Sequence, residues 1–291
     1  MELCSTLAQS VGEPLAGSAP FASVWVLLEQ PGPWGQKALT QSHLDPKLGR
    51  GLYDWANGSP LRLGTIRRPG RHADEHRAIV ERSLLIARTE PTGSWLWHAQ
   101  ITDPRCILDI DPAVLLAATD PPAAFLPAGE LVDHALLVCT NAKRDRCCAL
   151  LGRPLVDAFS TSMPGRVWET SHLGGHRFAP TLVSLPDGYL FGGPNAGDLT
   201  VAACRGRSSL PAAGQAAELA ALTHWGVEHP TALDVVARSS SEFQVSSLGE
   251  FRPGTPPVTV TIERVPAEQQ RPESCGREPA EWQRLTAHVL P

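Results

Sequence analysis

One order of secondary structure elements occurs twice along the 291 residues, and this repetition restricts the fold more than any other feature. Each half is expected to contain a strand, a helix, three strands and a closing helix. In the second half, the last two of the three strands are expected to form a hairpin. In the first half, the expected elements are 22–30, 45–57, 61–67, 83–88, 94–101 and 111–118. In the second half, they are 134–139, 145–159, 166–170, the hairpin 181–191 and 212–225.

Helices that alternate with strands and end in a hairpin are typical of a thioredoxin-like arrangement. We therefore predict an α/β protein with two thioredoxin-like domains in tandem, at residues 1–125 and 126–225. A C-terminal α+β extension, residues 226–291, is expected to pack on the second domain. Within it, "ALDVVARS" (232–239) is a helix candidate and "PVTVTIERV" (257–265) a strand.

Composition excludes several classes of protein. Apolar residues make up 42% of the chain and charged residues 19%, as in globular proteins. A net charge of −5 without a long basic block argues against binding to nucleic acid. No apolar run of ~18 residues predicts a membrane span, and "MELCSTLAQS" does not resemble an export signal, so we expect a cytoplasmic protein. Seven irregularly spaced cysteines favour metal or redox chemistry over a disulfide framework.

The segment "VCTNAKRDRCCALLGRPL" carries most of the candidate chemistry. Cys139 ends a predicted strand, and Cys147 and Cys148 begin the next predicted helix. The helix N-terminus and nearby basic side chains would favour thiolate, the form that binds metal. These basic residues are Lys143, Arg144 and Arg146.

The segment "SHLGGHRFAP" follows the next strand and contains His172 and His176. Adjacent glycines, Gly174 and Gly175, disfavour a helix and predict a sharply bent loop. This loop can fold back over the cysteine loop, which makes a joint site of two cysteines and two histidines plausible. Eight residues separate Cys139 from Cys148, a spacing wider than in zinc fingers and better suited to a two-iron cluster.

At these residues the chain resembles the sucrase/ferredoxin-like proteins, also called thioredoxin-like ferredoxins. The matching segments are "CTNAKRDRCCALLGRPL", "WETSHLGGHRFAPTLVSLPDG", "EQPGPWG" and "IRRPGR". The resemblance implies a [2Fe-2S] cluster with Cys139, Cys148, His172 and His176 as ligands, and the doubled cysteine leaves Cys147 as the alternative ligand. The residues expected around the cluster are Lys143, Arg144, Arg146, Gly174, Gly175 and Arg177.

The predicted function is one-electron transfer, by a carrier or an oxidoreductase component rather than a hydrolase, since no pair of catalytic carboxylates can be placed. Two alternatives stay open: a module in which the same four residues bind Zn²⁺, and a thiol-disulfide oxidoreductase that uses Cys147 or Cys148. The redox partner proteins and the oligomeric state are left open.

Other residues have structural interpretations. His72 and His76 in "RHADEH" are expected on a solvated helix face, and Trp34 in "EQPGPWG" either fills the core behind a proline turn or forms a lid or partner contact. The remaining cysteines stand alone in the sequence and are expected to pack inside the protein, with Cys275 the least certain because it lies in a loop. They are Cys4, Cys106, Cys204 and Cys275.

Overall fold

The computed structural model describes residues 3–70, 80–248 and 254–290. The described chain divides into two compact units, each built from segments that are distant in sequence. The central unit comprises residues 22–173 and 183–188, and the terminal unit comprises 1–21, 174–182 and 189–291. The predicted domain limits at 125 and 225 follow the order of the elements and stay a prediction. His72 and His76 lie outside the described residues.

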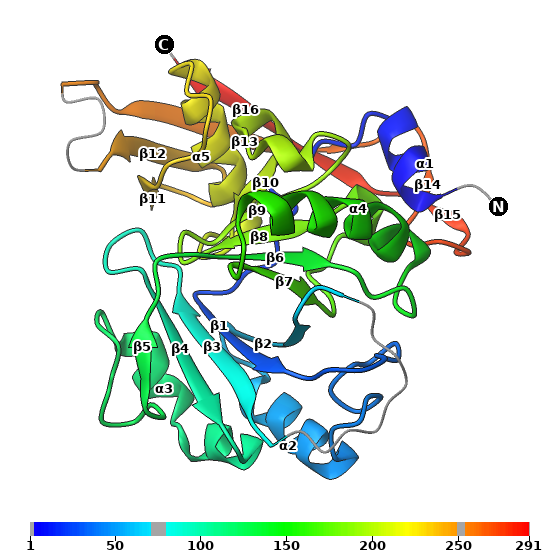
Figure 1. The fold of residues 1–291 in the computed structure, drawn as a ribbon. Coiled ribbons are helices and arrows are strands. Elements are labelled where there is room, and N and C mark those ends of the chain that lie inside the picture. The colour runs from blue at the N-terminus through cyan, green and yellow to red at the C-terminus, as the bar shows by residue number, and fades with distance from the viewer. Residues whose placement is uncertain (1–2, 71–79, 249–253, 291) are drawn as a thin grey trace. The chain divides into compact units, whose positions relative to one another are not determined.

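One mixed sheet organises the central unit, with the strand order β8-β6-β7-β2-β1-β3-β4-β5 (Figure 1). Its strands are β1 (Val24–Glu29), β2 (Leu61–Arg67), β3 (Arg82–Arg88), β4 (Trp95–Ile101), β5 (Gly129–Leu131), β6 (Ala135–Cys139), β7 (Val167–Thr170) and β8 (Leu182–Leu185). Its helices are α2 (Pro46–Ala56), the 3-10 helix η1 (Pro104–Asp109), α3 (Pro112–Ala117) and α4 (Arg146–Ser162). The α/β class is confirmed, whereas the tandem thioredoxin-like description stays a prediction.

Two parallel strand pairs form the middle of this sheet. β1 and β2 are joined through α2, and β6 and β7 are joined through α4, while β2 and β7 pair antiparallel between them (Figure 1). The sequence of β1, "VWVLLE", is almost entirely apolar because both faces of a central strand are buried. Helix α2 begins where Asp45 accepts hydrogen bonds from the backbone N–H groups of Lys47 and Leu48, with Pro46 at its first position.

The terminal unit combines short helices with strands from the end of the chain. Helix α5 packs against the antiparallel sheet β11-β12-β13-β16, and its many alanine and leucine side chains are buried there. Its helices are α1 (Cys4–Ser10), α5 (Ala212–His224) and the 3-10 helices η2 (His176–Phe178), η3 (Ala196–Asp198) and η4 (Val201–Ala203). Its strands are β9 (Tyr189–Phe191), β10 (Cys204–Arg207), β11 (Leu233–Ala237), β12 (Glu242–Ser247), β13 (Val258–Pro266), β14 (Arg271–Pro272), β15 (Pro279–Ala280) and β16 (Gln283–Leu290).

The helix predicted in "ALDVVARS" is wrong, because this segment forms β11. Its β-branched Val235 and Val236 suit a strand, and Val235 lies opposite Val245 of the antiparallel neighbour β12. The described residues after Gly226 form strands and loops only, so the α+β description of the extension is corrected to β. The strand predicted in "PVTVTIERV" is confirmed as β13.

The predicted elements before residue 226 match the structure closely. Each predicted strand and helix there overlaps an observed element, with ends that differ by up to three residues. Among the helices within the described ranges, none combines the length and the apolar character needed to cross a membrane.

Candidate metal centre

The topology of the central unit brings Cys139 and His172 to one edge of the sheet. Cys139 is the last residue of β6 and lies opposite Thr170, the last residue of β7. Because β6 and β7 are parallel, their carboxyl ends meet at the same edge. His172 follows Thr170 by two residues and therefore leaves the sheet beside Cys139.

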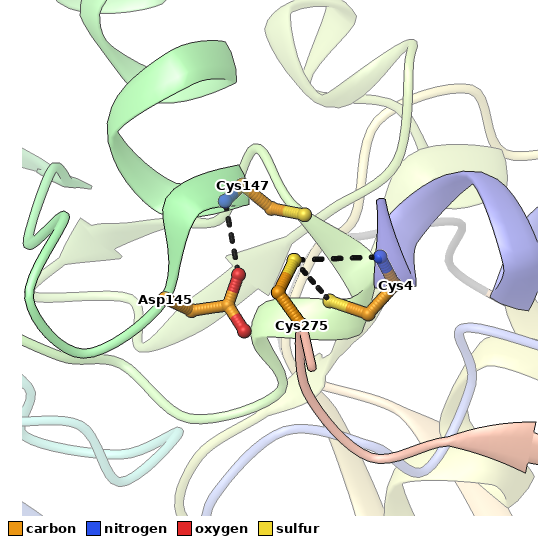
Figure 2. Close-up of side chains that lie close together, drawn as sticks. All are labelled: Cys4, Asp145, Cys147 and Cys275. Carbon is orange, nitrogen blue, oxygen red and sulfur yellow. Dashed lines mark hydrogen bonds between the residues drawn. The ribbon is translucent and has the colours of Figure 1, made fainter. Parts of the chain in front are cut away.

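Helix α4 brings Cys148 to the same edge. Asp145 caps this helix, since its carboxylate accepts a hydrogen bond from the N–H of Cys147 at 2.9 Å (Figure 2). Gly152 allows the helix to approach the strand closely: a Cβ at this position would lie 2.3 Å from the carbonyl oxygen of Cys139. The N-terminal part of α4 is thus held against the end of β6.

Cys139 contacts both the Cys148 thiol and the His172 imidazole, and Cys139 and Cys148 have no exposed surface. The hydrogen bond from Cys148 lowers the pKa of Cys139 well below its usual value, and His172 acts in the same direction against the effect of burial. The same hydrogen bond, together with burial, raises the pKa of Cys148. The pair therefore favours one thiolate stabilised by one thiol.

Arg62 is a neighbour of this group that sequence reasoning missed. Its guanidinium donates to the backbone carbonyl of His172 at 2.9 Å. Burial lowers the pKa of Arg62 to about 10, while the negative charge of Cys139 opposes this change. An arginine inside the otherwise apolar start of β2, "LRLG", was the available sequence signal.

Hydrogen bonds to β2 fix the chain just before His172. The N–H of Ser171 donates to the Thr65 carbonyl at 3.0 Å, and the Ser171 hydroxyl accepts from the N–H of Thr65 at 3.3 Å. The Cys139 thiol itself lies 3.7 Å from the Ser171 carbonyl oxygen. The backbone that carries His172 is thereby anchored beside Cys139.

The three basic residues predicted near the cysteines differ in exposure. Lys143 and Arg146 are exposed, and Arg144 is half-buried. The side-chain oxygen of Asn141 accepts hydrogen bonds from the N–H groups of Lys143 and Arg144, which shapes the loop into a turn. The charges of Lys143 and Arg146 therefore face water rather than the buried thiols.

The glycines between the two histidines bend the chain, as predicted. Gly174 and Gly175, in the terminal unit, have φ values of 80° and 66°, in the left-handed region that suits glycine. A Cβ on Gly175 would also lie 2.2 Å from the guanidinium of Arg205, which donates to the Gly174 carbonyl at 3.0 Å. His176 begins the 3-10 helix η2 rather than lying in an irregular loop.

Arg177, expected near the cluster, forms ion pairs inside the terminal unit. Its guanidinium lies 2.8 Å from the Glu13 carboxylate and 3.1 Å from that of Glu273. His176 belongs to this unit, whereas Cys139, Cys148 and His172 belong to the central unit. Joint ligation by all four residues therefore stays a prediction.

Two cysteines that stand alone in the sequence contact one another in the terminal unit. The Cys4 and Cys275 sulfur atoms are 3.6 Å apart, and the N–H of Cys4 points to the Cys275 sulfur at 3.5 Å (Figure 2). Because the two cysteines are 271 positions apart in the sequence, no local spacing could have indicated this contact. Cys204 is buried as expected, which raises its pKa.

The segment "EQPGPWG" buries its tryptophan. The Trp34 indole N–H donates to the Gln30 carbonyl at 2.9 Å, and the Arg67 guanidinium lies 4.1 Å from the centre of its ring. Of the two interpretations of this segment, the structure supports the proline turn with Trp34 in the core.

Comparison with known proteins adds a single finding. A family model described as sucrase/ferredoxin-like matches residues 15–228, which is most of the chain. No curated protein and no solved structure matches the chain.

Proposed function

Since the chain belongs to the sucrase/ferredoxin-like family, we propose that it transfers electrons through a [2Fe-2S] cluster held by Cys139, Cys148, His172 and His176. One observation carries the proposal: the buried contact of the Cys139 thiol with the Cys148 thiol and the His172 imidazole. Thiolate sulfur and imidazole nitrogen are the ligand types that iron–sulfur clusters use. A bound cluster would supply one-electron redox chemistry.

The residues of the central unit suit this role. The depressed pKa of Cys139 favours its thiolate form, and the half-buried Arg62 side chain places a positive charge near it. Burial limits access of water and oxidants to the two sulfur atoms. Each histidine that binds metal through one ring nitrogen keeps the other available to hold a proton, so electron uptake can be linked to proton uptake.

Two other functions use the same side chains. Zn²⁺ also binds cysteine and histidine, so a structural zinc site is the main alternative. Thiol-disulfide exchange needs a sulfur atom that a partner can reach, and the lack of exposed surface on Cys147 and Cys148 argues against it. The contact of Cys139 with Cys148 favours Cys148 over Cys147 as the second ligand.

The test is anaerobic purification followed by metal and sulfide analysis with visible and electron paramagnetic resonance spectra. We expect about two irons and about two acid-labile sulfides per chain, and a brown or red protein. Stoichiometric zinc without sulfide, even after cluster reconstitution, would support the zinc module instead. Independence of the reduction potential from pH between about 5 and about 10 would contradict histidine ligation.

A further inference from the structure

A cavity of about 770 Å³ opens in the central unit beside the cysteine loop. It lies where the loop after β1, the ends of β2 and β7, the loop after β6 and the middle of α4 meet. Its volume is in the range of sites for small molecules. The main residues that line it are Pro33, Trp34, Arg67, Lys143, Arg153 and Glu169.

A buried ion pair forms one wall of the cavity. Arg67 lies 2.6 Å from the Glu169 carboxylate, which also accepts a hydrogen bond from the Thr140 hydroxyl at 2.6 Å. The Glu169 carboxylate therefore accepts hydrogen bonds from both Arg67 and Thr140. Asp157 lines the same cavity.

Two further cations line the cavity, Lys143 on the loop and Arg153 on α4, and both are exposed. Together with Arg67, they give three positive charges against two carboxylates. Burial is the main reason why the pKa of Arg67 is lowered, and the nearby charge of Arg153 acts in the same direction. Because Glu169 already pairs with Arg67, an anion in the cavity would be attracted mainly to Arg153 and Lys143, and it would reduce the repulsion between Arg153 and Arg67.

Beside the ion pair, the cavity lining is apolar and rigid. Trp34 is fixed by its hydrogen bond to the Gln30 carbonyl and by the Arg67 guanidinium over its ring. Pro33 and Val156 are further apolar residues that line the cavity. A site with an apolar wall and a few fixed charges selects a molecule with an apolar body and one charged group.

We propose that this cavity binds a small organic anion, with its phosphate or carboxylate group at Lys143 and Arg153 and its apolar part against Trp34. Both head groups match the donor geometry of arginine, and phosphate also suits lysine. This anion site is separate from the proposed cluster site, and anion binding does not require a bound cluster.

The test is calorimetric titration of the full-length protein with phenyl phosphate, benzoate and the neutral benzyl alcohol. We expect saturable binding of phenyl phosphate or benzoate, and the better of the two identifies the head group. Arg153→Gln and Lys143→Gln should each weaken that binding about tenfold, the scale of one charge-assisted hydrogen bond. Benzyl alcohol should bind weakly or not at all.

Arg146→Gln is the matched control, because Arg146 is exposed on the same helix but does not line the cavity. It should bind the probe as the wild type does. Absence of saturable binding for both anions, or an equal loss in Arg146→Gln, would overturn the proposal. The titration does not depend on metal content, so its failure would leave the electron-transfer proposal unaffected.

Discussion

The two parallel strand pairs of the central unit place different chemistry at the same position of one scaffold. In the first pair, the loop after β1 carries Trp34, which is buried and tied to Gln30 and Arg67. In the second pair, β6 ends at Cys139, and the loop after it leads to Cys148 in the first turn of α4. The strand-to-helix loop is therefore a place where the fold accepts either a packing residue or reactive groups, and side chains rather than topology decide which.

A buried ion pair is one of the contacts that join the ends of the two pairs. Arg67 at the end of β2 and Glu169 of β7 are direct partners across the antiparallel strands. The same Arg67 guanidinium lies over Trp34, and the same Glu169 accepts from Thr140, which follows Cys139. The packing loop of the first pair and the cysteine loop of the second are thus connected through two buried side chains.

The largest expected effect separates the cysteines of the second pair. Cys139→Ser and Cys148→Ser should reduce bound iron to near zero, because each removes a proposed ligand, whereas Cys147→Ser should retain it. Iron and sulfide analysis of the three anaerobically purified variants is the measurement. Iron lost from Cys147→Ser but kept in Cys148→Ser would show that the second ligand is Cys147.

Trp34→Ala tests the first pair. Removing a buried tryptophan should lower the free energy of unfolding by about 3 kcal/mol, because a large cavity replaces packed side chains. Iron content should change little, because Trp34 contributes no ligand. Urea unfolding and metal analysis on the same preparation separate the two effects, and Trp34→Phe, which keeps most of the ring packing, should lose less stability. Loss of iron at full stability would show that this loop serves the metal centre.

The starts of the helices in the two strand pairs could be predicted from the sequence. Asp45 before Pro46, and Asp145 before the helix of Cys147, are local signals that act over a few residues. The parallel pairing of β6 with β7 then places Cys139 near His172. By contrast, the contact of Arg67 with Glu169 spans 102 positions. Only the folded chain shows it.

The errors and omissions have the same physical origin. "ALDVVARS" contains helix-forming residues, yet pairing with β12 makes it a strand, so tertiary contacts outweighed local preference. Arg62 and the Cys4–Cys275 contact were missed because each depends on segments distant in sequence. The place of His176 relative to the cysteines is the part of the candidate site that stays a prediction.

Close helix packing is expected to be needed in both pairs. Gly152→Ala should lower the free energy of unfolding by about 2 kcal/mol, because the added Cβ would lie 2.3 Å from the Cys139 carbonyl oxygen. Gly49→Ala should do the same in the first pair, where the Cβ would lie 1.8 Å from the Leu39 carbonyl oxygen. Gly51→Ala on α2 is the control, since its nearest neighbour is 3.8 Å away, and it should be neutral or stabilising by up to ~1 kcal/mol. Urea unfolding of the three variants is the measurement, and equal stability of all three would contradict this account.

The smallest expected effect is a change of stability with pH. It compares the residue before β6, the first strand of the second pair, with the residue before β1, the first strand of the first pair. β6 is preceded by His134, whose ring nitrogen lies 3.0 Å from the Ser184 hydroxyl, whereas β1 is preceded by the non-titrating Ser23. Burial lowers the pKa of His134 below the ordinary value of 6.5, and Arg166 adds to this while Asp187 opposes it. As pH falls through 6.5, His134 becomes protonated in the unfolded chain, whereas in the folded chain it stays neutral until a lower pH. The folded state therefore loses stability relative to the unfolded state as pH falls.

The wild type should therefore lose stability relative to His134→Gln between about pH 7.5 and about pH 5.5, where histidine titrates. The half-buried ring keeps some contact with water, so the difference should stay under ~1 kcal/mol. Ser23→Ala should change stability by the same amount at both ends of this range, because Ser23 carries no proton that titrates there. Thermal or urea unfolding at the two pH values measures all three proteins. A wild type that gains stability relative to His134→Gln on acidification would mean that a carboxylate such as Asp187, rather than burial, controls the His134 ring.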